Sequence, residues 1–421
     1  MRNEPVAAKA VIPGQRAPSD PLAAFADADP RARTDGLGWV ARAVFGDPRL
    51  RLTVSDDKTA IARYAVIPSL DNARFLLPLA SRRVTAAALL AYNALRPPKV
   101  RASRAAIGAL ARIGALGVTR APVLSVHAPD GVELLWDQLA GLLDSPRLHA
   151  AIGIRPPDPH HKPTLQLFDD DGRPRGYAKI GWNEGTRAMV LAEVATLSDL
   201  PPVGGDMPEI PGLLLHTSLA DREIAIIAPM PRGVRRIAHP DTPRAAAMLA
   251  VARRGGPPAA QQTLRDSTFL ATWRRRAKGA GAVDGFIEAL TARDGELALE
   301  FGDWHGDWVP WNMARHRGRL LVWDWENRAP DVPIGFDLAH QAFQTALSTH
   351  GRPAALCAEA VGAALRAHGP VLGLDGPRQR FVADAYLVEL WLRTYELSAG
   401  GAGWNPKLHP ALLEVLATRL A

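Results

Sequence analysis

The chain has 421 residues, of which 47% are hydrophobic and 22% are charged. This composition excludes a wholly disordered or collagen-like chain, and the length suits two or three domains with a sizeable core. The single cysteine, Cys357, excludes an intrachain disulfide and a multi-cysteine zinc site. Only seven of the 50 basic residues are lysine, so the net charge of +7 reflects an arginine-rich composition and gives little indication of a nucleic-acid partner.

The N-terminal sequence has an acid at Glu4 and no apolar run after it, unlike a signal peptide. The most apolar stretches, 84–95 and 105–118, are interrupted by Asn93 and Arg112 and are shorter than the roughly 20 residues of a membrane-spanning helix. We therefore expect a soluble, cytoplasmic protein with no membrane partner.

Residues 1–36 show neither a helical nor a strand period, which indicates a flexible tail. Residues 37–145 predict an accessory α+β domain without a catalytic pattern. Its expected elements, in chain order, are strands at 51–54 and 60–67, helices at 83–95 and 103–115, a strand at 123–126 and a helix at 132–143. Ser103 is the expected cap of the second helix, which a break at Pro97-Pro98 separates from the first.

Short strands dominate residues 146–230 and helices dominate residues 231–421. In the first part we expect strands at 148–154, 165–168 and 176–181, a helix at 184–197, and strands at 210–215 and 223–228. Pro229-Met230-Pro231-Arg232-Gly233 then ends the sheet, as an interlobe linker would. In the second part we expect helices at 243–254, 261–277, 283–292, 335–349, 353–368, 377–398 and 410–420, with one tryptophan-rich interruption at 299–327.

That interruption contains the most informative motif. Residues 301–313 read Phe-Gly-Asp-Trp-His-Gly-Asp-Trp-Val-Pro-Trp-Asn-Met. Phosphoryl transfer to a hydroxyl needs an anion near the acceptor proton and oxygen ligands for Mg²⁺, and a loop of the form His-x-Asp-x-x-x-x-Asn supplies both. Asp307 and Asn312 have this spacing, and Asp324 follows as a second acid. A hairpin turning at Arg317-Gly318 would bring Asp324 back beside Asn312.

On these motifs the chain resembles the aminoglycoside phosphotransferase and choline kinase group of small-molecule kinases. The resemblance implies a bilobal protein-kinase-like α+β fold, with a small β-rich N-lobe over 146–230 and a helical C-lobe over 231–421. It implies ATP and Mg²⁺ as cofactors and a small-molecule hydroxyl as acceptor. Asp307 corresponds to the catalytic residue, and the metal ligands correspond to Asn312, Asp324 and, unless it is a solvated surface acid, Glu326. His305 is expected to hold the loop, and Asp337 to brace it through backbone hydrogen bonds.

The N-lobe contains matching nucleotide-binding candidates. Lys179 lies in a short apolar strand of a chain in which arginine is the usual base, and Glu193 follows inside a predicted helix. The resemblance assigns Lys179 to the nucleotide phosphates, Glu193 to the ion pair that holds this lysine, and Met230 to the nucleotide site. No Gly-x-Gly-x-x-Gly occurs between the first two strands, where Gly153 stands alone, so the phosphate contacts of that loop are not assigned.

The acceptor is less well defined by the sequence. Trp308, Trp311, Asp384 and Trp391 are candidate substrate residues, with core packing as the alternative for the tryptophans. Residues 335–421 contain seven acids and seven bases, which favours a sugar, amino sugar or similar metabolite over a polycation. An aminoglycoside- or choline-type kinase and a pseudokinase or nucleotide-binding scaffold remain alternatives. Asp303 repeats the Gly-Asp-Trp pattern, but the fifth residue after it is a tryptophan, so it is not a second catalytic candidate.

Overall fold

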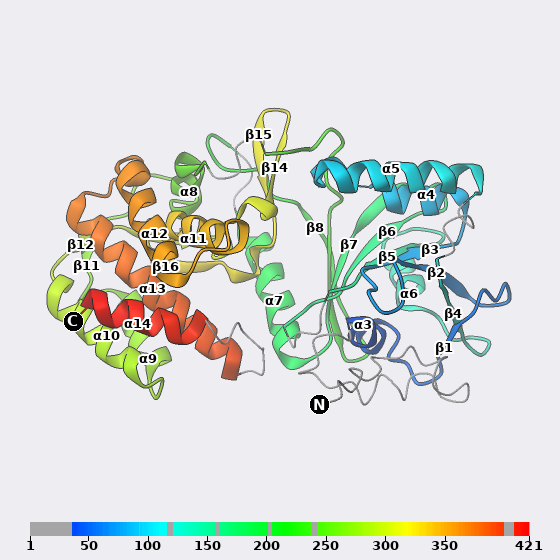
Figure 1. Ribbon diagram of the computed structural model, residues 1–421, viewed down its shortest axis with the longest axis horizontal. Coiled ribbons are helices and arrows are strands. Elements are labelled where there is room, and N and C mark those ends of the chain that lie inside the picture. The colour runs from blue at the N-terminus through cyan, green and yellow to red at the C-terminus, as the bar shows by residue number, and fades with distance from the viewer. Residues whose placement is uncertain are drawn as a thin grey trace, which may run out of the picture. The chain divides into compact units, whose positions relative to one another are not determined.

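The structure is a computed structural model. It describes residues 36–91, 93–115, 121–155, 160–200, 204–237, 242–399 and 408–420, so the expected tail at 1–36 lies almost entirely outside the described residues. The chain forms two compact units (Figure 1). The first comprises Met1–Leu191 and Gly212–Arg232, and the second comprises Ala192–Pro211 and Gly233–Ala421. The chain therefore crosses between the units three times: within helix α7 (Glu184–Asp199), between Pro211 and Gly212, and between Arg232 and Gly233.

A nine-stranded antiparallel sheet forms the centre of the first unit, in the order β1-β4-β2-β3-β5-β6-β7-β9-β8. Its strands are β1 (Arg51–Val54), β2 (Ala62–Ile67), β3 (Phe75–Pro78), β4 (Val123–His127), β5 (His149–Gly153), β6 (Thr164–Phe168), β7 (Pro174–Gly181), β8 (Leu213–Leu219) and β9 (Arg222–Ile227). The predicted α+β class is confirmed by this sheet and by the helices of both units.

Each face of the sheet has its own hydrophobic core, because side chains alternate along a strand. Leu76 of β3 packs in the cluster that includes α3 (Gly36–Val44) and α6 (Leu135–Leu142). Its neighbour Leu77 packs in the cluster that includes α4 (Arg82–Leu90) and α5 (Pro98–Ile113). Two helical layers therefore enclose the sheet from opposite sides.

A separate accessory domain over 37–145 is not confirmed. Strand β3, which the sequence pattern missed, pairs antiparallel with β5, so that Leu76 lies opposite Ile152. Tyr64 from the N-terminal segment and Ile224 from β9 belong to the same buried cluster. The N-terminal strands thus extend the sheet of the later residues and share its core.

The start of α5 also differs from the expectation. The helix begins at Pro98, with Pro97 as its N-cap, and Ser103 lies within it. Proline is well suited to the first helical position, where the backbone N–H that it lacks would have no partner within the helix. The Pro97-Pro98 pair therefore starts this helix as well as separating it from α4.

The second unit is mainly helical. Its helices are α8 (Ala245–Ala252), α9 (Thr268–Ala277), α10 (Ala282–Asp294), α11 (Phe336–Gln344), α12 (Ala354–His368), α13 (Gly376–Ala399) and α14 (Leu408–Leu420). Its short strands are β10 (Arg235–Arg236), β11 (Gln262–Thr263), β12 (Ala298–Leu299), β13 (Phe301–Trp304), β14 (Met313–His316), β15 (Arg319–Val322) and β16 (Ala329–Pro333). Helix α13 is buried continuously from Phe381 to Leu392, so it forms the central helix of this unit's core.

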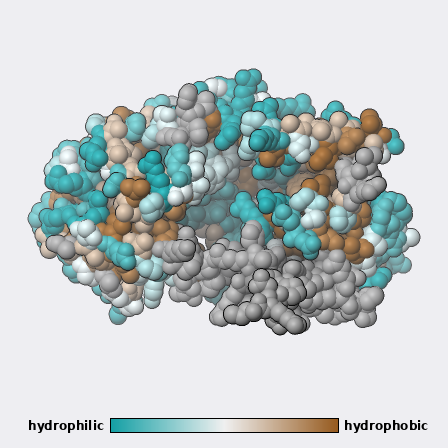
Figure 2. Space-filling model, in the orientation of Figure 1, coloured by the Kyte–Doolittle hydropathy of each residue, from teal (hydrophilic) through white to brown (hydrophobic). Residues whose placement is uncertain are grey.

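The surface carries both hydrophilic and hydrophobic side chains. Figure 2 shows hydrophilic and hydrophobic side chains interspersed over the visible face. Among the described residues, no helix combines the length and hydropathy that a membrane span requires.

Candidate active site

The hairpin expected after the motif is confirmed. Met313 of β14 lies opposite Val322 of β15, and the backbone N–H of Trp323 donates to the carbonyl oxygen of Asn312 at 3.1 Å. Arg317 and Gly318 both have left-handed backbone angles, with φ values of 49° and 83°, as a two-residue hairpin turn requires. The hairpin therefore returns the chain so that Trp323, the residue before Asp324, lies beside Asn312.

Asp337 fixes the start of the loop through its backbone. One carboxylate oxygen accepts from the N–H of His305 at 2.8 Å, and the other accepts from the N–H of Gly306 at 3.1 Å. Gly306 has a φ of 78°, and a Cβ there would collide with the carbonyl oxygen of Asn327. The backbone hydrogen bonds expected of Asp337 are present. They lower the pKa of its carboxyl, but burial has the larger effect and raises that pKa to about 7.

His305 is fully buried beneath the loop and makes hydrogen bonds from both ring nitrogens. Its Nδ1 accepts from the backbone N–H of Asp307 at 3.2 Å, and its Nε2 lies 3.1 Å from the carbonyl oxygen of Trp323. This pairing assigns the ring proton to Nε2. Burial lowers the pKa of His305 to about 4, so the ring is neutral at neutral pH and ties the loop to the end of the hairpin.

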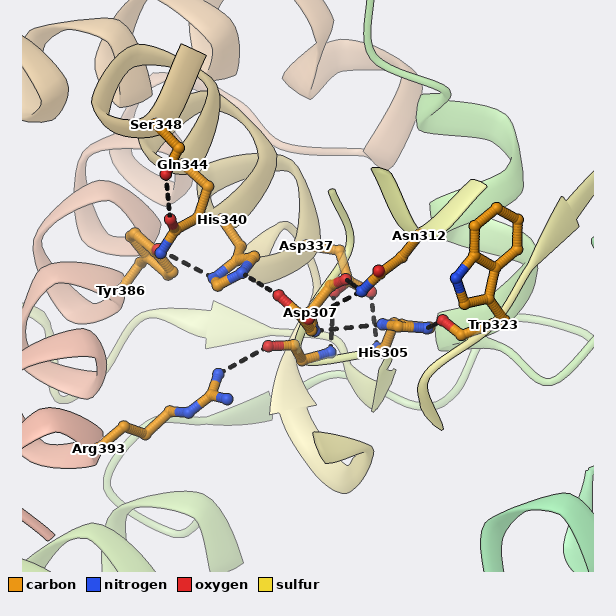
Figure 3. A network of polar contacts seen from close by, with 11 residues as sticks. His305, Asp307, Asn312, Trp323, Asp337, His340, Gln344, Ser348, Tyr386 and Arg393 are labelled. Atoms are coloured by element: carbon orange, nitrogen blue, oxygen red, sulfur yellow. Dashed lines mark hydrogen bonds and ion pairs between the residues drawn. The ribbon is translucent and has the colours of Figure 1, made fainter. Parts of the chain in front are cut away.

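Both carboxylate oxygens of Asp307 have partners (Figure 3). Asn312 Nδ2 donates to Oδ2 at 2.8 Å, and His340 Nε2 lies 3.2 Å from Oδ1. Burial opposes the charge of Asp307, but the hydrogen bond from His340 and the positive charge of Arg393 lower its pKa to about 2. Asp307 is therefore ionised at neutral pH and held in one orientation.

The contact of Asp307 with His340 was not predicted from the sequence. The His340 ring is buried on α11, and its Nδ1 lies 3.1 Å from the hydroxyl of Tyr386 on α13 (Figure 3). The available signal was the position of His340 three residues after Asp337, which places both on one face of a helix. No signal links Tyr386 to the loop, because it lies far along the chain and on another helix.

Three carboxylates of the second unit gather beyond the hairpin. Glu193, Asp324 and Glu326 each place an oxygen within 4.8 Å of the others. Asp324 has a φ of 66°, a left-handed conformation that aspartate tolerates better than most residues. Asn312 adds an amide oxygen on the adjoining loop, since its nitrogen donates to Asp307. A set of carboxylate and amide oxygen donors fits Mg²⁺.

The nucleotide candidates are divided between the two units. Lys179 lies on β7 of the first unit with its side chain buried, and Met230 follows β9 in the same unit. Glu193, which the sequence assigned to Lys179, is buried in the second unit and lies within the carboxylate cluster.

Most of the candidate substrate residues have packing contacts. Trp308 is fully buried, with its ring 5.9 Å from that of His305. The ring of Trp391 stacks on the rings of Tyr395 and His409, at centroid distances of 5.3 and 4.4 Å. The buried carboxylate of Asp384 is paired with Arg293 at 2.8 Å and with Arg419 at 2.7 Å. These contacts favour the packing alternative for Trp308 and Trp391 and give Asp384 two ion-pair partners, whereas Trp311 is 49% exposed.

Asp303, which the sequence did not favour as a second catalytic residue, belongs to a network of ion pairs. It is buried on β13, where Arg328 contacts it, and Arg254 lies 3.7 Å away. Both arginines also contact Asp199 at the end of α7, each at 2.9 Å. The four residues form an alternating charge network that connects the helix of Glu193 to the strand leading into the loop.

A cavity of about 450 Å³ adjoins the loop on the side of α9, β16 and α13. Arg393, from its α13 wall, donates to the carbonyl oxygen of Gly306 at 2.7 Å and lies 5.1 Å over the ring of Trp304. Asn327, another lining residue, packs against Gly306. Gly306, the residue immediately before Asp307, therefore contacts two lining residues of the cavity, Arg393 and Asn327.

No family model and no curated protein sequence matches the chain. Similar solved structures include a thermostable mutant of aminoglycoside phosphotransferase APH(4)-Ia, at 14% identity and a TM-score of 0.45, covering 68% of this chain and 98% of that chain. Choline kinase LicA from Streptococcus pneumoniae is 12% identical, with a TM-score of 0.43 and coverage of 62% and 89%. Amicoumacin kinase hAmiN is 12% identical, with a TM-score of 0.37 and coverage of 62% and 84%. The first two carry the names of the group that the motifs resemble, but TM-scores below 0.5 carry no conclusion about function, which must come from the site.

Proposed function

We propose that the protein is an ATP-dependent phosphotransferase that moves the γ-phosphate to a hydroxyl of a small molecule, with a sugar, an amino sugar or a similar metabolite as acceptor. The observation that supports this proposal is the pairing of an ionised, doubly anchored Asp307 with an adjacent set of oxygen donors. General bases and metal ligands of this kind are the parts that phosphoryl transfer requires, because positioning and charge stabilisation supply most of its rate.

The residues take the following roles in this proposal. Asp307 orients the acceptor hydroxyl and accepts its proton, as the bond from acceptor oxygen to phosphorus forms and the bond from phosphorus to the ADP oxygen breaks. Asn312, Asp324 and Glu326 would hold Mg²⁺, which when bound neutralises charge on the phosphates. Lys179 binds the nucleotide phosphates and Met230 contributes to the nucleotide site, while the ion pair of Lys179 with Glu193 stays a prediction from the sequence. His305 and Asp337 keep the loop in place.

The test is an acceptor screen with the purified full chain and Mg-ATP. Sugars, amino sugars, aminoglycosides and choline-like alcohols are offered, and both ADP and the phosphorylated product are measured. Asp307→Ala should lower kcat about 10²–10⁴-fold, the usual contribution of a positioned acid or base. Asp375→Ala, at an exposed acid ahead of α13, is the matched control and should leave kcat unchanged. Transfer by Asp307→Ala at the rate of the parent would refute the catalytic assignment.

A further inference from the structure

The cavity beside Gly306 has the size of a small-molecule site. Its volume of about 450 Å³ lies within the roughly 300–1,000 Å³ of typical ligand pockets. Its lining combines aromatic rings, including Trp304 and Phe269, with charged and polar side chains from α9 and α13. Two of its lining residues, Arg393 and Asn327, contact Gly306, so the cavity lies beside the loop that carries Asp307.

Two of the three acids of this cavity, Glu389 and Glu396, are paired with one arginine. Arg276 of α9 donates from Nη1 to both carboxylate oxygens of Glu389, at 3.0 and 2.9 Å. Its Nε and Nη2 each donate at 2.9 Å to one carboxylate oxygen of Glu396. The indole N–H of Trp273 also donates to Glu389, at 2.7 Å. Burial opposes the charge of Arg276, but these contacts raise the pKa of its guanidinium above the usual value.

Two other charged side chains complete the lining. Arg393 is held by Gly306 and Trp304, and Asp331 lies exposed within β16, with a φ of 56°. The five charged lining groups, three acids and two arginines, carry a formal charge of −1. A polycationic acceptor would require a larger surplus of unpaired acid, because each buried ammonium group needs a compensating charge.

We propose that this cavity binds the acceptor and selects a sugar-sized polyhydroxylated molecule that carries no more than one positive charge. Arg276 is the specificity-determining residue, because it occupies the two carboxylates that would otherwise attract polyamines. The aromatic residues give the cavity apolar lining for a sugar ring, while the paired charged groups offer fixed donors and acceptors to its hydroxyls. This inference rests on the proposed function and names its class of substrate.

The test measures binding to the full chain by calorimetry, without ATP, so that it does not depend on turnover. The ligands are glucose, glucosamine and an aminoglycoside with at least four amino groups. The parent should bind the two sugars more tightly than the aminoglycoside. Arg276→Met should weaken sugar binding at least tenfold and strengthen aminoglycoside binding at least tenfold. Arg274→Met is the matched control, because Arg274 lies on the same helix but pairs with the exposed Glu288 outside the cavity.

A second variant keeps the test decisive if Arg276→Met does not fold, which thermal unfolding would show. Glu396→Gln removes one acid that is 42% exposed at its side chain and should lower the affinity for glucosamine relative to glucose. Tighter binding of the aminoglycoside than of sugars by the parent would overturn the proposal. So would unchanged ligand preference in the folded variants. Failure of the proposed function is a different result, namely sugar binding without phosphoryl transfer from ATP.

Discussion

At the scale of single residues, the orientation of Asp307 depends on a chain of buried polar groups. Burying a histidine is unfavourable unless both ring nitrogens have partners. His340 meets this condition, because its Nε2 contacts Asp307 and its Nδ1 contacts the Tyr386 hydroxyl. Burial lowers the pKa of His340, so its ring is neutral, with Nε2–H donating to the carboxylate and Nδ1 accepting from the tyrosine. His340 is therefore a positioning residue for the proposed base.

Replacing His340 tests this role. We expect His340→Leu to lower kcat about 10–100-fold, the usual effect of removing a partner that orients a site residue, with little change in the KM for ATP. His340→Gln, which retains an N–H donor, should recover part of the loss. His350→Leu, at an exposed histidine, serves as the control. Steady-state kinetics measure these values, and a parent-like kcat in His340→Leu would show that Asp307 needs no such partner.

At the scale of secondary-structure elements, charge networks connect segments that sequence order separates. Asp199, Arg254, Asp303 and Arg328 join the end of α7 to β13 and to the segment after Glu326. Asp303 is largely buried, so its charge must be compensated by the arginines. The network thereby fixes the helix that carries Glu193 relative to the segment that carries Asp324.

Removing one charged member of this network should lower the free energy of unfolding more than removing two oppositely charged members together. We expect Arg328→Met to lower the free energy of unfolding by about 3 kcal/mol, because it leaves the buried Asp303 carboxylate with only the longer contact to Arg254 at 3.7 Å. The double variant Arg328→Met/Asp303→Asn should recover most of this loss. Denaturant unfolding measures both, with Arg265→Met at an exposed pair as the control. Simple additivity of the two single losses would indicate that the residues do not interact.

At the scale of the whole molecule, the N-terminal segment completes the core of the first unit. Strand β3 covers the edge of β5, and buried side chains on both sides of residue 145 belong to one cluster. Without that segment, β5 would become an exposed edge and the apolar residues beneath α3 and α6 would face water.

A truncation distinguishes this arrangement from an independent accessory domain. We expect a chain of residues 146–421 to be insoluble or to unfold without a cooperative transition, whereas the full chain should unfold cooperatively. Soluble yield and thermal unfolding followed by circular dichroism measure the difference. A folded 146–421 chain that retained phosphotransferase activity would support the separate domain that residues 37–145 first suggested.

Features that depend on local spacing were predicted from the sequence. The period of apolar residues predicts most helices and strands, and the spacing of Asp307, Asn312 and Asp324 around a tight turn predicts that the three come together. Neighbouring residues on one helix turn, loop or hairpin are held close by the backbone itself. The pattern therefore carries the information without knowledge of the rest of the fold.

Contacts between distant segments were decided only by the tertiary structure. The pairing of β3 with β5, the contact of His340 with Tyr386 and the pairing of Arg276 with Glu389 each join elements that no spacing connects. These contacts form because buried polar groups and strand edges must find partners wherever packing brings them. The length, charge and single cysteine excluded several classes of protein, and local motifs indicated the chemistry of the site. Packing of distant elements decided how Asp307 is held and which charges the neighbouring cavity presents.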